Sequence, residues 1–157
     1  MQETRIELDD TDKRLLAALQ ADAHSTSDAL SAKLNLSASQ VGRRRQRLEA
    51  AGVIEGYRAR LRPNAVGLTV QAFISVQLAS QDPTKVRPFL RMVETRSEIV
   101  SAWTLTGEAD YLLRVYCEDL SALNQLIHDG LLAHPAVARV QSQIVMNQQK
   151  ADAPLPL

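Results

Sequence analysis

The apolar residues of this chain change their spacing near Val70, and this change limits the possible folds more than any other feature. Before Val70, leucines and valines recur every three or four residues, the spacing of helices with one buried face. From Val70 onward, stretches such as VQAFISVQLA alternate apolar and polar residues, which predicts half-buried strands. The 157-residue chain is therefore expected to be an α+β protein with a helical half and a sheet half.

Three helices are expected in the first half, and each has a recognisable start. Asp9 and Thr26 are good caps for the first two helices. Ser37 followed by Gln40 predicts a capping box at the start of the third helix, which Gly52 ends. A short helix, a tight turn and a capped helix form a helix-turn-helix, whose second helix enters the major groove of DNA by its N-terminal end.

Positive charge gathers in one part of a chain that is neutral overall. Residues 33–62 contain eight Lys and Arg against two Asp and Glu, although the whole chain has 18 of each sign. Arg43, Arg44 and Arg47 can share one face of the third helix, away from the apolar residues. A solvated surface remains the simplest interpretation of any charge run, but this asymmetry is typical of a protein that binds a polyanion.

The stretch from Val53 to Arg62 alternates apolar and basic residues. This alternation predicts a strand with one basic face, such as the wing of a winged helix. The DNA-contacting set predicted from the helix and the wing is Ser37, Ser39, Gln40, Arg43, Arg44, Arg47, Arg58 and Arg60.

Residues Leu8 to Leu61 resemble the DNA-binding half of the Lrp/AsnC (leucine-responsive/asparagine-responsive, feast/famine) transcription regulators. The resemblance rests on LDDTD at 8–12, LNLS at 34–37, the arginine pair at 43–44 and RLEAAGVIEGY at 47–57. The chain departs from the family pattern at Arg45, where an apolar residue is usual, and at Gly42, where leucine is frequent. Arg45 is expected to lay its aliphatic stem over the core.

The second half is expected to follow the order β-α-β-β-α-β of a ferredoxin-like domain. Strands are predicted over 70–79, 99–106, 110–117 and 137–146, and helices before 99 and over 120–134. The hairpin turn is expected at 107–109, where Gly107 can take a positive φ. The helix before residue 99 is expected either to begin near Arg87 or to bend at Pro88.

This half resembles the effector-sensing (RAM) domain of the same family, through TGEADYLLRV at 106–115. The expected organisation is a winged helix-turn-helix domain over 1–62, a linker over 63–69, an effector-sensing and oligomerisation domain over 70–150 and a flexible tail over 151–157. Two halves this small gain stability by association, and Phe73 or Trp103 on the uncovered sheet face can meet a second copy.

The residues of TGEADY alone leave two interpretations open. They are either a solvated hairpin turn or part of a pocket in which backbone N–H groups hold a carboxylate and an acid holds an ammonium. The resemblance favours the pocket and implies that it lies between dimers. The effector-binding residues that it implies are Thr106, Gly107, Glu108, Asp110, Leu120, Gln143, Ile144 and Val145.

No pattern for catalysis, metal binding or cofactor binding is found in the sequence. There is no phosphate-binding glycine loop, no HExxH and no G-x-S-x-G, and the single Cys117 is expected to be a buried thiol. We therefore expect no enzyme and no cofactor, with an amino-acid effector for which leucine or methionine is favoured.

Three functions stay open from the sequence. They are an amino-acid-responsive transcription regulator, an architectural nucleoid-like DNA-binding protein, and a sensing module that acts on an enzyme; the basic helix argues against the third. The expected partners are double-stranded DNA, a small amino acid, and further copies in a dimer that assembles to a tetramer or octamer. The polar, acidic first residues and the lack of a long apolar run predict a cytoplasmic protein without a membrane partner.

Overall fold

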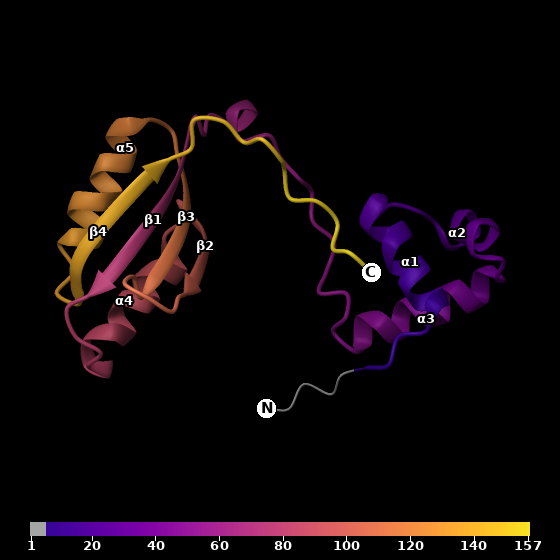
Figure 1. Cartoon of the computed structure of the whole chain (residues 1–157). Helices are drawn as coiled ribbons and strands as arrows, with labels where there is room; N and C mark the ends of the chain where they lie inside the picture. The colour runs from indigo at the N-terminus through magenta and orange to yellow at the C-terminus, as the bar shows by residue number, and fades with distance from the viewer. Residues whose placement is uncertain (1–5) are drawn as a thin grey trace. The chain divides into compact units, whose positions relative to one another are not determined.

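The computed structural model describes residues 6–157, which form two compact units (Figure 1). The helical unit consists of residues 6–59 together with 150–157, and the sheet unit consists of residues 60–149. The first five residues of the expected 1–62 domain lie outside the described residues.

The helical unit contains the three predicted helices, which are α1 (Asp10–Ala21), α2 (Ser27–Leu34) and α3 (Ala38–Ala50). Asp9, Thr26 and Ser37 cap them as predicted, each accepting a hydrogen bond from a backbone N–H of the first turn. Asn35 ends α2 in the left-handed region, with φ 56°, and so makes the tight turn into α3. Local sequence signals therefore determine where these helices begin and how the chain turns between them.

The core of the helical unit is small. Seven buried apolar side chains fill it in the described part of the chain: Leu15, Leu16, Leu19, Leu30, Leu34, Val41 and Leu48. Two polar residues, Asp12 and Ser25, are buried beside them.

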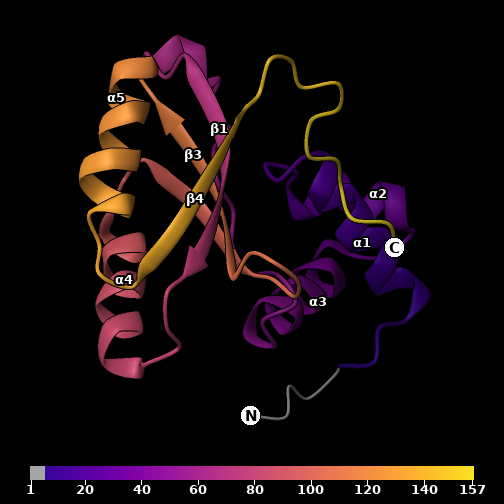
Figure 2. The ribbon, with the colours of Figure 1, turned by 60° about the vertical axis from the view of Figure 1, so that its left-hand side comes forward.

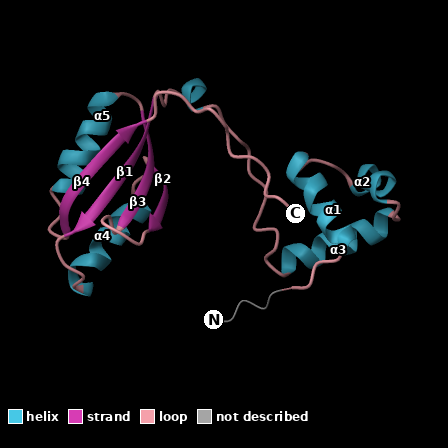
Figure 3. Cartoon of the chain, viewed as in Figure 1, coloured by secondary structure: helices cyan, strands magenta, loops and turns pink. Residues whose placement is uncertain are grey.

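The strand predicted over Val53–Arg62 is not formed. After α3 the described chain has turns and then irregular backbone up to a 3₁₀ helix, η1 (Pro63–Val66), as Figure 3 shows in pink. Alternation predicts which residues could face a neighbour, but a strand also needs an adjacent strand to accept and donate its backbone hydrogen bonds. No strand of the described chain pairs with this segment, so the prediction of a strand is wrong for the single chain.

The sheet unit has the predicted order of elements. They are β1 (Val70–Leu78), α4 (Pro83–Thr95), β2 (Ile99–Thr104), β3 (Tyr111–Cys117), α5 (Leu120–Gln125), η2 (Leu126–Leu132) and β4 (Val137–Ile144). The four strands are antiparallel in the order β2-β3-β1-β4. This arrangement agrees with the predicted ferredoxin-like βαββαβ domain.

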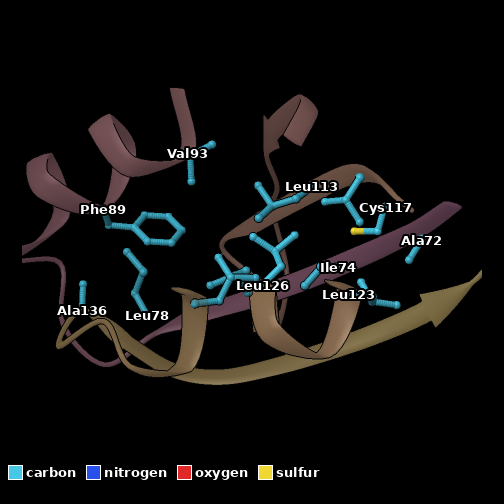
Figure 4. Packing of buried hydrophobic residues seen from close by; sticks show 13 residues of the cluster. Ala72, Ile74, Leu78, Phe89, Val93, Leu113, Cys117, Leu123, Leu126 and Ala136 are labelled. Atoms are coloured by element: carbon cyan, nitrogen blue, oxygen red, sulfur yellow. The ribbon is translucent and has the colours of Figure 1, made fainter. Parts of the chain in front are cut away.

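Both helical segments cover the same face of the sheet (Figures 1 and 2). Ala72, Ile74 and Val76 of β1 point into the core on that face, together with Leu113 and Val115 of β3. Figure 4 shows how Phe89 of α4, Leu123 of α5 and Leu126 at the start of η2 pack over these strands. Side chains alternate along a strand, so the intervening residues of β1 and β3 point to the uncovered face.

Three details of the sheet unit differ from the prediction. Helix α4 begins at Pro83 behind an Asp82 cap and continues through Pro88, so a start near Arg87 is wrong. The ladder between β2 and β3 ends at the pair Thr104–Tyr111, which makes the hairpin loop six residues long rather than three. The second helical segment also widens from α5 into the π-helix η2.

The C-terminal residues belong to the helical unit. The backbone N–H of Leu155 donates to Gln20 Oε1 (2.6 Å), and Gln20 Nε2 donates to the Leu155 carbonyl (3.2 Å). Among the described residues, no helix is long and apolar enough to cross a membrane.

Candidate nucleic-acid interface and effector site

The start of α3 presents an ordered polar edge. Ser37 Oγ accepts from the Gln40 N–H (3.2 Å), and Gln40 Oε1 accepts from the Ser37 N–H (2.9 Å), which completes the predicted capping box. Ser39 lies between them and is exposed. The capping box fixes the first turn, so this edge offers a rigid set of hydrogen-bonding groups to a partner.

Four of the predicted DNA-contacting residues line one surface hollow. The hollow has a volume of about 290 Å³, and its walls are Leu36, Gln40, Arg43, Arg44 and Arg47. Three guanidinium groups around one concave surface make a site for an anion such as a phosphate group. The structure therefore brings together Gln40 and the three arginines that the helical spacing predicts on one face.

Two of these arginines also bind carboxylates at the start of α1. Arg44 Nη1 lies 2.7 Å from both Asp9 Oδ2 and Asp12 Oδ1, and Arg47 Nη2 donates to Asp12 Oδ2. The hydrogen bond from the Asp12 N–H and the contact with Arg44 lower the pKa of Asp9. The same two carboxylates raise the pKa of Arg44, so it stays charged.

Arg45, which departs from the family pattern, has other partners. Arg45 Nε donates to Glu49 Oε1 (3.1 Å) and to the Tyr57 hydroxyl (2.9 Å), and its guanidinium lies over the Tyr57 ring, 4.7 Å from the centroid. The Tyr57 hydroxyl donates in turn to Glu49 Oε1 (2.9 Å). This cluster ties the segment after α3 to the end of that helix and accounts for Arg45 at a position where the family usually has an apolar residue.

Arg58 and Arg60 lie in the exposed irregular segment after α3. Neither lines the hollow, and Arg60 falls within the sheet unit. The two predicted wing arginines are therefore divided between the units, and only Arg58 belongs to the same unit as the arginines of α3.

The predicted effector residues at 106–110 lie in the loop between β2 and β3, where Gly107 has φ 120°. Asp110 closes this loop: its N–H donates to the Val76 carbonyl (3.0 Å) and its carbonyl accepts from the Leu105 N–H (2.9 Å). The Asp110 carboxylate accepts from the Leu78 N–H (2.7 Å) and from Gln81 Nε2 (2.8 Å). Both of its oxygens therefore already hold the loop against the end of β1.

The remaining predicted effector residues lie at the other end of the sheet. Ile144 pairs with Ala72 near the start of β1, Gln143 precedes it, and the Val145 N–H donates to the Gln71 carbonyl (2.8 Å). Leu120 follows β3, whose last residue pairs with Val70. At about 3.3 Å per strand residue, roughly 13–20 Å of β1 separates these residues from the 106–110 loop. One chain therefore does not bring the eight residues together.

The comparisons with known proteins identify both units. Residues 8–55 match the winged helix-turn-helix DNA-binding domain, and residues 71–155 match the Lrp/AsnC ligand binding domain. The chain belongs to the Lrp/AsnC family. Its Lrp/AsnC relatives include the HTH-type transcriptional regulator AldR of Mycolicibacterium smegmatis, 34% identical, with 95% of this chain and 87% of AldR covered. The leucine-responsive regulatory protein of Rhizobium meliloti is also 34% identical, with 93% and 94% covered.

Solved Lrp/AsnC structures agree with this assignment. A transcriptional regulator from Neisseria meningitidis, in complex with L-methionine, superposes with a TM-score of 0.91 at 37% identity, covering 96% of this chain and 97% of that one. A feast or famine regulatory protein from M. tuberculosis, complexed with L-methionine, gives a TM-score of 0.83 at 34% identity, covering 93% and 97%. Like these Lrp/AsnC relatives, the chain is a DNA-binding transcription regulator and not an enzyme.

Two residues of the candidate sites were missed by sequence reasoning. In the sequence Asp12 stands out only as part of LDDTD at 8–12, although it falls in line with Leu15, Leu16 and Leu19 on the buried face of α1. That position on the apolar stripe could have indicated a buried partner for a cation. Gln81 gave no signal, because only the fold brings it to Asp110.

Proposed function

We propose that this Lrp/AsnC protein is a sequence-specific transcription regulator whose assembly and DNA binding respond to a small apolar amino acid, leucine or methionine in particular. The DNA-binding part rests on the hollow on α3. Ser37, Ser39 and Gln40 lie at the end of the helix that would approach the bases, and the arginines around the hollow offer charge to phosphates. Arg58 and Arg60 would add further phosphate contacts.

The effector part rests on the chemistry of the two separated clusters. The loop at Gly107 offers backbone N–H groups and the exposed Glu108, which suit the carboxylate and the ammonium of an amino acid. Leu120 and Ile144 are 59% and 51% exposed and offer apolar surface for an aliphatic side chain. A lysine or aspartate side chain would lose hydration there without gaining a partner. In this proposal Asp110 keeps the loop in shape and does not contact the effector's ammonium directly.

The separation of these clusters is the observation that carries the proposal. If both line one pocket, different copies of the chain must contribute them, and an effector that completes the pocket favours the assembled form by mass action. The L-methionine complexes of two structural neighbours support an effector of this class. We extend the proposal to a cytoplasmic location, which follows from a role on DNA.

The uncovered face of the sheet supports self-association. Phe73 and Trp103 lie on this face, opposite Arg114 and Leu112 in the register, and Trp103 is 45% exposed. An aromatic, partly apolar sheet face is a surface that a second copy can cover. We propose a dimer through this face, with further assembly to a tetramer or octamer.

Two other functions remain as test outcomes. An architectural, ligand-independent DNA-binding protein would use the same α3 surface but bind no amino acid. A sensing module acting on an enzyme would have no use for three arginines around one hollow.

Calorimetry with leucine, methionine, lysine and aspartate, combined with sedimentation of the full chain, tests the effector proposal. We expect leucine and methionine to bind in a graded series, because one methylene is worth only about 1–3 kcal/mol, and to change the sedimenting species. Tight binding of lysine or aspartate alone would refute the apolar pocket. No binding by any of the four would favour the architectural function.

A matched pair of glycine variants locates the effector site. Gly107 and Gly67 both have positive φ (120° and 82°), and a Cβ at either would meet no atom within 4 Å, so alanine strains each backbone without a clash. We expect Gly107→Ala to weaken leucine or methionine binding at least about fivefold and Gly67→Ala to leave it unchanged. Equal effects of the two variants would remove the loop from the site.

A further inference from the structure

Asp12 is the most deeply buried charged residue of the described chain, with 1% of its surface exposed. It lies where α1 meets α3 and accepts hydrogen bonds from Arg44 and Arg47. An unpaired carboxylate in this position would be costly, since desolvation penalises a buried charge without a partner. The ion pairs of Asp12 are therefore a condition of the packing of α1 on α3.

Arg44 is the main partner in this network. Its Nη1 contacts Asp12 and Asp9 at 2.7 Å each, and only 28% of its side chain is exposed. Turning this guanidinium toward a phosphate would break both contacts and leave Asp12 with Arg47 as its one cationic partner among the described residues, beside the hydrogen bond from the Asp9 N–H (3.2 Å). Arg47 differs, because 48% of its side chain remains exposed while one nitrogen contacts Asp12.

Arg43 contrasts with its neighbour in the sequence. It is exposed, lines the same hollow and makes no hydrogen bond or ion pair with residues 6–157. A cation with no internal partner can meet a phosphate without breaking any contact, and so it gives its full electrostatic contribution to DNA binding. Two adjacent arginines of one helix therefore differ: Arg44 is held by carboxylates of its own chain, whereas Arg43 is available to a phosphate.

We infer that Asp12 and Arg44 are positioning residues, which fix α3 against α1 for base recognition, and that Arg43 rather than Arg44 supplies the phosphate contact from this part of the helix. The inference rests on the proposed DNA interface and reassigns a residue within it. It replaces the prediction that Arg44 itself contacts DNA.

The matched variants Arg43→Gln and Arg44→Gln test this division in the full chain. Affinity is measured between about 50 and 200 mM salt for two probes, a random-sequence duplex and the duplex that the wild-type protein selects from a random library. Each variant removes one positive charge from neighbouring positions on the same helix, so their net charges are equal. Measurements are made at a temperature at which both variants are folded, as judged by circular dichroism.

We expect Arg43→Gln to reduce the slope of log K against log salt by about 0.9, which is the value of one phosphate contact. This variant should also lower the affinity for both duplexes by the same factor. Arg44→Gln should leave this slope unchanged, reduce the preference for the selected duplex, and lower the melting temperature of the helical unit by at least about 5 °C. A slope reduced by about 0.9 in Arg44→Gln, with an unchanged melting temperature, would overturn the inference.

The double variant Asp12→Asn/Arg44→Gln keeps the test decisive if Arg44→Gln alone does not fold. Removing both partners leaves no unpaired buried charge at this pair, so the loss in melting temperature should be smaller than the sum of the two single losses. Its salt slope should equal that of the wild type. Additive losses, or a slope reduced by about 0.9, would contradict the assignment. Failure of the wild-type protein to bind either duplex would refute the DNA interface itself. The melting temperatures of the wild type, the two single variants and the double variant would still test the contact between Asp12 and Arg44.

Discussion

The helical unit has a carboxylate at its centre, whereas the sheet unit has an apolar centre. Asp12 and Ser25 are the buried polar residues of the described chain, and both lie in the helical unit. The sheet unit instead buries thirteen apolar side chains in the described chain, nearly twice the seven of the helical unit. The two units therefore depend on different interactions, and conditions that weaken ion pairs should affect them unequally.

This difference corresponds to what each unit has to do. A surface that binds DNA must carry several arginines close together, and the helical unit neutralises part of their mutual repulsion with Asp9, Asp12 and Glu49. The sheet unit holds the 106–110 loop at one end of its sheet and the ends of β3 and β4 at the other end. A larger apolar core gives this sheet rigidity without charges.

The largest expected effect is a loss of packing in the sheet unit. Phe89 is fully buried and contacts the rings of Tyr111 and His134, at centroid distances of 5.4 and 5.7 Å. We expect Phe89→Ala to lower the free energy of unfolding by about 3–5 kcal/mol. Thermal unfolding followed by Trp103 fluorescence, which reports on the sheet unit, measures this loss.

Met146→Ala is the control, because Met146 is 99% exposed. It should change the free energy of unfolding by less than about 0.5 kcal/mol. Similar losses for the two variants would show that the sheet unit is not stabilised by the core described above.

The second expected effect is that acid lowers the stability of the helical unit more than that of the sheet unit. Hydrogen bonds lower the pKa of Asp9, Asp22 and Glu49 in this unit, and in the sheet unit they lower the pKa of Asp82. A carboxyl whose pKa is lowered by folding stabilises the fold above its unfolded value, and this contribution disappears as the pH falls through the folded value. The ordinary values are 3.8 for Asp and 4.5 for Glu, so the loss should begin below about pH 4.5.

Amide hydrogen exchange from about pH 5 down to pH 3 distinguishes the two units, once rates are corrected for intrinsic exchange. Protection should fall earlier in α1 and α3 than in β1 and β3. An equal decline in both units would contradict the prediction that the helical unit contains more of the carboxylates whose pKa is lowered by folding.

The smallest expected effect is a gain in the stability of the helical unit. Gly42 lies inside α3, and a Cβ there would lie 3.9 Å from Ser27 Oγ, an ordinary van der Waals distance. Gly42→Ala should therefore stabilise this unit by about 0.5–1 kcal/mol through helix propensity. Gly52→Ala is the opposing control, since Gly52 has φ 71° and alanine would be strained there. A lower melting temperature for Gly42→Ala would indicate that the α2–α3 contact cannot accept a methyl group.

The features that were predictable from the sequence depend on neighbours along the chain. The caps at Asp9, Thr26 and Ser37, the left-handed Asn35 and the order of strands and helices all follow from local residue chemistry and periodicity. The start of α4 was also available, because Asp82 followed by Pro83 is a good cap and first helical residue, but Pro88 was given more weight.

The features that were not predictable depend on residues distant in the chain. The alternation over 53–62 says nothing about whether a partner strand is present, and the structure of one chain has none there. The burial of Asp12 follows from the packing of α3 on α1, and the division of the effector residues follows from the strand order. In each case the residue type was correct for the chemistry, while its surroundings were set by the tertiary fold.

We propose above all that one unit binds DNA under the control of an amino acid bound by the other. The most direct test of this proposal is the affinity of the full chain for the duplex it selects, measured at fixed salt with and without saturating L-methionine or L-leucine. We predict that the affinity changes at least about fivefold, a coupling of about 1 kcal/mol, together with a change in the sedimenting species. An affinity and an assembly state that are the same with and without both amino acids would contradict it.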